Sequence, residues 1–324
     1  MPGSPIHIIT TLQEVRGNDI HAVELLRSLQ ANGQSVSLWS DRPGGFVARY
    51  GGRVINPYGG QMPRGGTLIL LGSWLTVDPW IDFSKPERLI LICNTSNRDQ
   101  LQRMVARLER PSLPKVELVY MSTRLRDAMG IPGRICPTIV DPARFQPRPQ
   151  PAENWGVGRL SADKPEKHHP DDASLYRLLA WYGAQVRLMG ASCLQQALDQ
   201  TPGVEVLPVG SEAAEDFLRS LSVFFYRTRE DWHEPSGRVV MEALACGLPV
   251  VAESRGGYTD WIEHGRNGFL FSTQEEAWEL LQTLQGDAAL RRRLGEAARD
   301  TAVALSNPDG RHVQEYLNWL QSPS

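Results

Sequence analysis

The chain has 324 residues, of which 41% are hydrophobic and 22% are charged, and its formal net charge is −3. These values are ordinary for a soluble globular protein, and they exclude a strong positive field that would attract nucleic acid. We therefore expect no nucleic-acid partner, whereas composition leaves peripheral membrane contact open. A chain of this length favours two domains over a single hydrophobic core.

The cysteines and the first residues bear on the cellular setting. The four cysteines are scattered and form no CxxC pair: Cys93, Cys136, Cys193 and Cys246. This pattern indicates neither a zinc site nor a disulfide framework, and it favours a reducing, cytoplasmic setting. The segment MPGSPIHIITTL lacks the basic and long apolar regions of a signal peptide, and no apolar run reaches transmembrane length.

The first part of the chain predicts alternating strands and helices. Short apolar runs predict strands, and apolar positions at helical spacing predict helices. The predicted strands are residues 6–10, 35–39, 67–71, 88–92 and 116–120, and the predicted helices are 20–31, 99–108 and 122–129. Successive strand–helix–strand units favour a parallel sheet covered by helices.

A proline-rich segment follows and predicts an interdomain linker. Its prolines are Pro137, Pro142, Pro147, Pro149 and Pro151. We therefore expect a first domain over 1–147 and a second over 148–305. The end of the chain, 306–324, should contribute a helix that packs back on the first domain.

The second part of the chain repeats the strand and helix alternation. Strands are predicted at 155–157, 185–189, 204–207, 223–226 and 248–252, with helices at 172–182, 275–304 and 312–320. The predicted fold class is therefore α/β, with two Rossmann-like, doubly wound domains facing a central cleft. Ligands of such sheets bind outside the carboxyl ends of the strands. This rule indicates the loops 12–19, 158–170, 228–237 and 254–259.

The segment 233–267 contains two glutamates, Glu234 and Glu242, with seven residues between them. Pro235 just after Glu234 and Gly247 at the far end bracket a helical run, so Glu234 should precede a helix and Glu242 should lie within it. A helix amino terminus presents free backbone N–H groups and binds anions, phosphate above all. A carboxylate beside such a site suggests that it holds a sugar hydroxyl. Alone, the pair could equally be surface charge on a helix.

Several motifs together resemble a known family. EPSGRVVMEALACGLPVVAESRGGYTDWIEHGRNGFLF resembles the carboxyl-terminal signature of retaining nucleotide-sugar glycosyltransferases with the GT-B fold, the group-1 (family 4) type. VDPARFQP at 140–147 resembles the family's domain junction, and GRLSADK at 158–164 resembles its phosphate-binding loop. The closing amphipathic helix resembles the family's last helix. The resemblance covers most of 137–324, and over 1–136 it rests on layout alone.

The resemblance implies roles for the glutamate segment. Glu242 would bind the ribose hydroxyls, and Glu234 would contact the donor sugar near its anomeric carbon. A carboxylate suits both tasks because it accepts hydrogen bonds from neighbouring hydroxyls. The distal phosphate would be held by the backbone N–H groups of Ser236, Gly237, Arg238 and Val239.

The basic loop 158–170 would serve the leaving diphosphate. The resemblance implies that Arg159 and Lys164 neutralise the charge that develops there, whereas a solvated basic loop is the alternative. No DxD-type metal motif flanks a suitable strand, so we expect a metal-independent enzyme without a cofactor. Lys167, His168 and His169 could extend the anion site. Adjacent histidines point in different directions on most backbones, which disfavours a metal site.

The remaining candidates belong to the other loops. Gly17 and Asn18 match the family's glycine-rich first loop, which lies under the diphosphate and acceptor. Asn94 stands near the position where the family often has a histidine, and it is the candidate for an acceptor-side polar group. His233 is the other candidate, although it could simply cap its loop. Gly210 and Ser211 follow a strand where the family seats the nucleotide base by backbone contacts.

The predicted function is transfer of a hexose-type sugar from a nucleoside-diphosphate sugar, UDP or GDP above all, to an acceptor hydroxyl with retained configuration. The resemblance implies bacterial polysaccharide, glycolipid or small-glycoside synthesis, in the cytoplasm or at the inner face of the membrane. Front-side displacement is the expected mechanism. Double displacement with Glu234 as nucleophile is the rival, and trapping a covalent glycosyl-enzyme would favour it.

Two other functions stay open at this point. A GT-B enzyme of another reaction would be a nucleotide-sugar epimerase, which needs no acceptor, or a phosphorylase, whose usual lysine-bound pyridoxal phosphate has no signature here. A non-catalytic nucleotide-sugar-binding module is the other. The joint presence of Glu234, Glu242, Arg159 and Lys164 argues against it.

Overall fold

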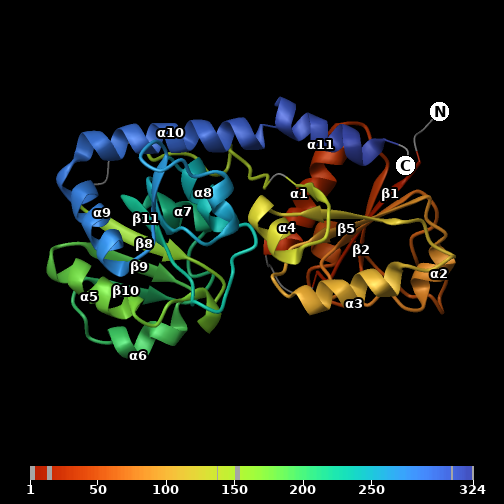
Figure 1. Ribbon diagram of the computed structural model, residues 1–324, viewed down its shortest axis with the longest axis horizontal. Helices are drawn as coiled ribbons and strands as arrows, with labels where there is room; N and C mark the ends of the chain where they lie inside the picture. Colours follow the sequence, from red (N-terminus) through yellow and green to blue (C-terminus); the bar gives the residue numbers. More distant parts are fainter. Residues whose placement is uncertain (1–3, 13–16, 137, 150–153, 308, 323–324) are drawn as a thin grey trace. The chain divides into compact units, whose positions relative to one another are not determined.

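A computed structural model describes residues 4–12, 17–136, 138–149, 154–307 and 309–322. The chain divides into two compact units, Met1–Ile139 with Pro308–Ser324, and Val140–Asn307. Each unit is an α/β structure built on its own parallel sheet (Figure 1), which confirms the predicted α/β class with two Rossmann-like domains. No helix in the described part of the chain is long and apolar enough to cross a membrane.

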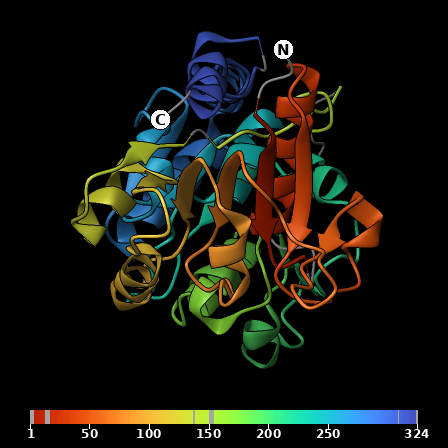
Figure 2. The ribbon, with the colours of Figure 1, turned by 90° about the vertical axis from the view of Figure 1, so that its right-hand side faces the viewer.

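The first unit has a seven-stranded parallel sheet in the order β3-β2-β1-β4-β5-β6-β7. The strands are β1 (Ile6–Thr10), β2 (Val36–Ser40), β3 (Arg53–Val54), β4 (Thr67–Leu71), β5 (Arg88–Cys93), β6 (Val116–Tyr120) and β7 (Arg134–Ile135). The helices are α1 (Gly17–Ala31), α2 (Trp80–Ser84), α3 (Arg98–Leu108), α4 (Thr123–Met129) and α11 (Arg311–Gln321), with the short 3₁₀ helix η1 (Ala48–Tyr50). Helices α1 and α3 cover opposite faces of the sheet (Figures 1 and 2).

The core of the first unit explains its strand pattern and the place of its last helix. Strands β1, β4 and β5 are buried along their whole length, as their unbroken apolar runs predict. Val313, Leu317 and Leu320 of α11 are fully buried in the same core. The Arg88 guanidinium adds a polar link, donating to the backbone carbonyl of Trp319 at 2.7 Å.

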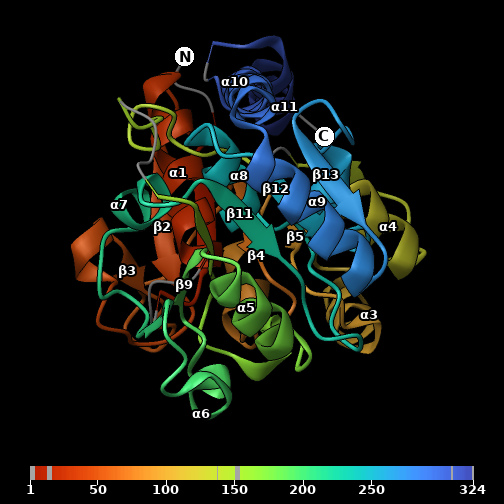
Figure 3. The ribbon, with the colours of Figure 1, turned by 90° about the vertical axis from the view of Figure 1, so that its left-hand side faces the viewer.

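The second unit has a six-stranded parallel sheet in the order β10-β9-β8-β11-β12-β13 (Figure 3). The strands are β8 (Gly156–Leu160), β9 (Gln185–Met189), β10 (Val204–Leu207), β11 (Val223–Tyr226), β12 (Val250–Glu253) and β13 (Gly268–Phe271). The helices are α5 (Asp172–Trp181), α6 (Gln195–Leu198), α7 (Ala214–Arg219), α8 (Arg238–Ala245), α9 (Gln274–Gly286) and α10 (Ala288–Ser306), with η2 (Pro165–Lys167), η3 (Ser192–Leu194) and η4 (Gly257–Asp260).

Alternate residues of the central strand β11 point into two separate cores. Phe224 and Tyr226 pack with α7, α8 and α10, whereas Val223 and Phe225 pack with α5 and α9. This alternation is what a central strand with helices on both faces requires. It also places Tyr226, the last residue of β11, on the same face as α8.

The boundary between the units lies earlier than the predicted 147/148. The second unit begins at Val140. Val140 and Phe145 are each 1% exposed and belong to the core of that unit. Of the five prolines, Pro137 and Pro151 lie outside the described residues, and the segment around Pro142 packs into the second unit.

The predicted helical stretch 275–304 is two helices. Helix α9 ends at Gly286 and α10 begins at Ala288. Asp287 separates them, and its side chain accepts a hydrogen bond from the backbone N–H of Leu290 at 2.8 Å. An aspartate in this position caps the start of a new helix. The many charged residues around Asp287 made this helix start hard to recognise in the sequence.

Candidate functional site

The carboxyl ends of the second sheet bring most predicted site residues of this unit to one edge. β8, β11 and β12 are parallel and adjacent, so the loops that follow them leave from the same side. These loops are residues 161–171, 227–237 and 254–256. Ligands of open α/β sheets bind at this edge.

Glu234 lies in the loop between β11 and α8, and its carboxylate is held by two side chains. Its Oε2 atom accepts a hydrogen bond from the Tyr226 hydroxyl at 2.7 Å and contacts the Lys167 ammonium. Burial raises the pKa of this carboxyl, but the charge and hydrogen bond of Lys167, with the hydrogen bonds of Tyr226 and the Gly237 N–H, outweigh it and lower the pKa. Glu234 is therefore ionised and can accept hydrogen bonds from hydroxyls.

Lys167 reaches Glu234 because the chain turns after Lys164. Pro165 begins η2, which ends at Lys167. The Lys167 ammonium lies 5.2 Å from the centroid of the Trp232 ring, and the side chain is 16% exposed. A nearly buried ammonium between a carboxylate and an aromatic face is a well-positioned cation. The sequence indicated Lys167 only as an extension of the anion site.

Lys164, the lysine that the resemblance favoured, has a different environment. Its side chain is 46% exposed, and its ammonium lies 4.0 Å from the carboxylate of Glu166. Among the residues that the structure describes, the lysine in contact with Glu234 is Lys167.

Arg159 is enclosed within the unit. Its side chain is fully buried, and it donates to the backbone carbonyls of Arg227 and Lys167, both at 2.5 Å. Its guanidinium also lies 4.6 Å from the centroid of the Tyr226 ring. The sequence predicted a cation facing a diphosphate. In this structure the Arg159 guanidinium instead fixes the backbone of Lys167 and the ring of Tyr226, the two residues that hold Glu234.

The two adjacent histidines are held by hydrogen bonds to the backbone of the second unit. His168 is buried, and its Nε2 lies 2.7 Å from the carbonyl oxygen of Gly190. Burial and the nearby Arg159 charge lower the pKa of His168 to about 3, so the neutral ring donates this hydrogen bond. Nδ1 of His169 accepts from the backbone N–H of Asp171 at 3.2 Å. No cluster of potential metal ligands occurs among the described residues.

Gly237 shapes the amino terminus of α8. Its φ is +77°, and a Cβ atom there would lie 2.5 Å from Cδ1 of Tyr258. The Tyr258 hydroxyl donates to the carbonyl of Glu253 at 2.8 Å, which holds the ring in place. Glycine meets both constraints, so the chain can turn into α8 and present its first N–H groups. The predicted phosphate-binding residues therefore stand at this helix start: Ser236, Gly237, Arg238 and Val239.

Glu242 lies one turn into α8. Its side chain is 7% exposed, and its Oε1 accepts a hydrogen bond from Nε of Arg238 at 2.9 Å. The predicted ribose-binding carboxylate therefore lies on the first turns of α8, the helix whose amino terminus forms the predicted phosphate site.

The other predicted residues of the second unit lie in turns. Gly210 and Ser211 follow β10, where Gly210 has a φ of +79° and the Ser211 hydroxyl donates to the Pro208 carbonyl at 2.7 Å. His233 is exposed. These positions follow carboxyl ends of strands, as predicted, but the structure gives them no role of their own.

In the first unit, the structure brings Asn18 and Asn94 together. The Asn94 amide donates to Oδ1 of Asn18, and Asn18 donates to the carbonyl of Leu71 at 3.1 Å. Gly17 begins α1 immediately before Asn18. Among the residues that the structure describes, Oδ1 of Asn94 is buried without a hydrogen-bond partner. The two asparagines lie at the carboxyl edge of their sheet, where the first-loop and acceptor-side residues were predicted.

Sequence reasoning missed Tyr226 and Trp232. Tyr226 is fully buried at the end of β11, and burial with the nearby Glu234 charge raises its pKa, so its hydroxyl stays protonated and donates to Glu234. A polar aromatic residue at the carboxyl end of a predicted central strand could have indicated Tyr226. Trp232 carried no such signal.

Comparison with known proteins gives the family of this region. Residues 179–301 match the family described as glycosyl transferases group 1. The chain is 38% identical over 93 residues to a D-inositol 3-phosphate glycosyltransferase of Streptomyces avermitilis, covering 28% of this chain and 19% of that protein. It is 32% identical over 168 residues to a GDP-mannose-dependent alpha-mannosyltransferase of Mycobacterium tuberculosis, covering 51% of this chain and 42% of that protein. The chain thus spans less than half the length of either relative.

Solved structures resemble the whole chain. HepE of Anabaena, in complex with UDP-glucose, has a TM-score of 0.77 at 17% identity, covering 98% of this chain and 100% of that chain. Sucrose-phosphate synthase from Thermosynechococcus elongatus has a TM-score of 0.73 at 16% identity, covering 98% of each chain. At this identity the likeness establishes the fold. Residues 179–301 therefore match the group-1 glycosyl transferases, in a chain that has the GT-B fold.

Proposed function

We propose that this protein is a retaining glycosyltransferase, which moves a sugar from a nucleoside-diphosphate sugar to an acceptor hydroxyl without a metal ion. The single observation that carries the proposal is the ionised Glu234, held by Lys167 and Tyr226 immediately before the amino terminus of α8. An acceptor for sugar hydroxyls, a cation and a phosphate-binding helix end occur together there. A donor sugar linked to a diphosphate needs these three groups.

The donor would bind along the first turns of α8. Glu242 accepts hydrogen bonds from the ribose, and the N–H groups of Arg238 and Val239 bind the distal phosphate. Glu234 accepts from the sugar hydroxyls near the anomeric carbon. UDP-glucose bound to HepE and the GDP-mannose dependence of the mycobacterial relative support a nucleoside-diphosphate sugar of either kind.

We assign the cation for the leaving diphosphate to Lys167 in place of Lys164. Transfer breaks the bond between the sugar C1 and the phosphate oxygen and leaves the electron pair on the diphosphate. Lys167 is positioned beside Glu234 by the Trp232 ring, whereas Lys164 is half-exposed beside Glu166. Arg159 would act indirectly, because its guanidinium holds the Lys167 carbonyl and the Tyr226 ring.

Retention would follow from attack on the same face that the diphosphate leaves. In this front-side displacement the acceptor oxygen bonds to C1, and its proton passes to a phosphate oxygen of the leaving diphosphate. The alternative nucleophile, Glu234, already accepts from Tyr226 and Lys167 through Oε2. Such stabilisation suits a hydroxyl-binding carboxylate better than a nucleophile, because it weakens nucleophilicity.

The proposal is tested by incubating the full chain with UDP-, GDP-, ADP- and dTDP-sugars and an alcohol acceptor library, without added metal and with a chelator present. We expect one donor to release its nucleoside diphosphate with formation of a glycoside whose anomeric configuration equals that of the donor. Inverted product, or turnover that stops with the chelator, would contradict the assigned reaction type. Conversion of the donor to another sugar without an acceptor would identify an epimerase.

A further inference from the structure

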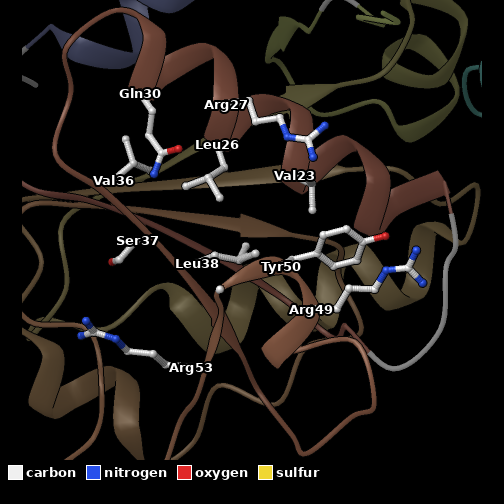
Figure 4. A pocket seen from close by; sticks show the side chains of 11 residues that line it. Val23, Leu26, Arg27, Gln30, Val36, Ser37, Leu38, Arg49, Tyr50 and Arg53 are labelled. Atoms are coloured by element: carbon white, nitrogen blue, oxygen red, sulfur yellow. The ribbon is translucent and has the colours of Figure 1, made fainter. Parts of the chain in front are cut away.

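A cavity of about 380 Å³ lies on the flank of α1 in the first unit, and nothing in the proposed transfer reaction uses it. Its apolar lining comes from α1 and the start of β2: Val23, Leu26, Val36 and Leu38. Three arginines line it as well, Arg27, Arg49 and Arg53. Figure 4 shows the Arg27 and Arg49 guanidiniums on the side of the Tyr50 hydroxyl, with Arg53 on the opposite side.

The cavity exists because the edge strand of this sheet is short. β3 pairs only Arg53 and Val54 with the end of β2, at Trp39 and Ser40. The first residues of β2 therefore have no strand beside them on that edge, and η1 passes there instead. Gly51, with a φ of +67°, turns the chain from η1 towards β3. A fixed concave surface is thus built from α1, β2 and η1.

The three arginines of the cavity have no carboxylate partner among the described residues. Some other arginines of the same unit do form ion pairs, such as Arg42 with Asp41 at 2.8 Å and Arg110 with Asp82 at 2.6 Å. No comparable ion pair or hydrogen bond involves the side chains of Arg27, Arg49 or Arg53 in the described part of the chain. Three guanidiniums without an ion pair in the described part of the chain therefore gather around one cavity.

Aromatic faces position two of these guanidiniums. Arg49 lies 5.7 Å from the centroid of the Phe46 ring and 5.9 Å from that of Tyr50, and Arg53 lies 5.5 Å from that of Trp39. A guanidinium that lies over a ring keeps its in-plane N–H groups available as donors. The aromatic contacts therefore restrain the charges without neutralising them.

We propose that this cavity binds a phosphate or diphosphate group attached to a small uncharged body. Arginine matches phosphate oxygens with parallel N–H donors, and the Gln30 amide and Tyr50 hydroxyl supply uncharged donors in the same lining. The apolar wall accommodates the rest of the molecule, and the volume suits a small ligand. This phosphate site belongs to the first unit and is independent of the α8 site. An experiment can therefore contradict one of the two proposed sites without contradicting the other.

The test uses inorganic pyrophosphate and the full chain, with binding measured by calorimetry at low ionic strength. The Arg27→Gln/Arg49→Gln variant removes two charges from the cavity. The control, Arg103→Gln/Arg124→Gln, removes two charges from exposed positions on α3 and α4. We expect the cavity variant to lose affinity at least about tenfold relative to the control, because charge-assisted hydrogen bonds to phosphate are lost. An Arg27→Lys/Arg49→Lys variant should recover part of this affinity.

Pyrophosphate that binds only at α8 would give equal affinities in the two charge-matched variants, and this result would overturn the proposal. A second arm identifies the source of the phosphate. The protein is sedimented with phosphatidylcholine vesicles that contain phosphatidic acid. If the control variant sediments with the vesicles and the cavity variant does not, the ligand is a lipid headgroup. Pyrophosphate binding without sedimentation would assign a water-soluble phosphate compound.

Discussion

At the scale of single residues, the candidate donor site depends on which lysine meets Glu234. Lys164 and Lys167 are three positions apart, and the sequence pattern favoured the first. The structure places the second against Glu234 because η2 turns the chain between them. A prediction from linear spacing could not include this turn, whose direction depends on Pro165 and on the buried His168 that follows.

The two lysines give a matched pair of variants. Lys167→Met should lower turnover of the donor by about 100-fold or more, because it removes a preorganised cation and leaves the buried Glu234 without its cationic partner. Lys164→Met should lower it only a few-fold, because an exposed charge is screened by solvent. Initial rates of nucleoside diphosphate release measure both. Equal losses, or a larger loss for Lys164→Met, would restore Lys164 as the cation of the site.

His168 should make the stability of the protein sensitive to acid. Its pKa is lowered to about 3 in the folded chain, so the unfolded chain binds an additional proton below its ordinary pKa of 6.5. The stability contributed by the neutral ring is therefore complete above pH 6.5 and is lost as the pH falls towards 3. Between pH 6.5 and pH 5 this loss should reach about 2 kcal/mol.

His168→Gln retains an N–H donor for the Gly190 carbonyl and does not titrate. Urea unfolding at pH 7 and pH 5 should show a smaller acid-induced loss in this variant than in the original chain. His264→Gln, at an exposed histidine, is the control and should change little. An unchanged pH dependence for His168→Gln would show that His168 is not the group responsible.

At the scale of elements, the start of α8 requires glycine at position 237 for two reasons, backbone conformation and space. Gly237→Ala combines a positive φ with a Cβ atom 2.5 Å from Tyr258, so we expect about 2–4 kcal/mol of destabilisation and a loss of donor affinity. Gly183 has a φ of +88°, but a Cβ atom there would have no neighbour within 4 Å. Gly183→Ala should therefore lower the free energy of unfolding by about 1 kcal/mol and leave donor affinity unchanged. Denaturant unfolding and nucleotide titration would measure both effects. Equal destabilisation would contradict the role of the Tyr258 ring.

Elements with strong apolar periodicity could be predicted from the sequence, and short ones could not. β1, β4 and β5 are buried runs, and their positions were clear. β3 and β7 have two residues each, which is too short for any pattern, yet β3 decides where the arginine-lined cavity opens. Asn18 and Asn94 were predicted from the family resemblance, whereas the contact of Trp232 with Lys167 joins segments far apart in the chain.

At the scale of the whole molecule, each unit has its own sheet and cores, so ligand effects should be local. Binding of the donor nucleotide should slow backbone hydrogen exchange in the second unit, within 161–171 and 227–239, because the proposed donor contacts lie there. Pyrophosphate at the arginine-lined cavity should instead slow exchange within 23–31 and 49–53. Mass spectrometry of exchanged peptides distinguishes the two patterns. Nucleotide protection confined to the first unit would contradict the assignment of the donor to the second.

The most direct test of the central claim is nucleotide binding to the original chain and to Glu242→Gln and Lys167→Met variants. Calorimetric titration with UDP, GDP, ADP and dTDP should find one that binds the original chain. Affinity should fall at least about tenfold in each variant, because each loses a charge-assisted contact to ribose or diphosphate. The absence of binding by all four, or equal affinity in the three proteins, would contradict a nucleotide-sugar site at Glu234, Lys167 and the start of α8.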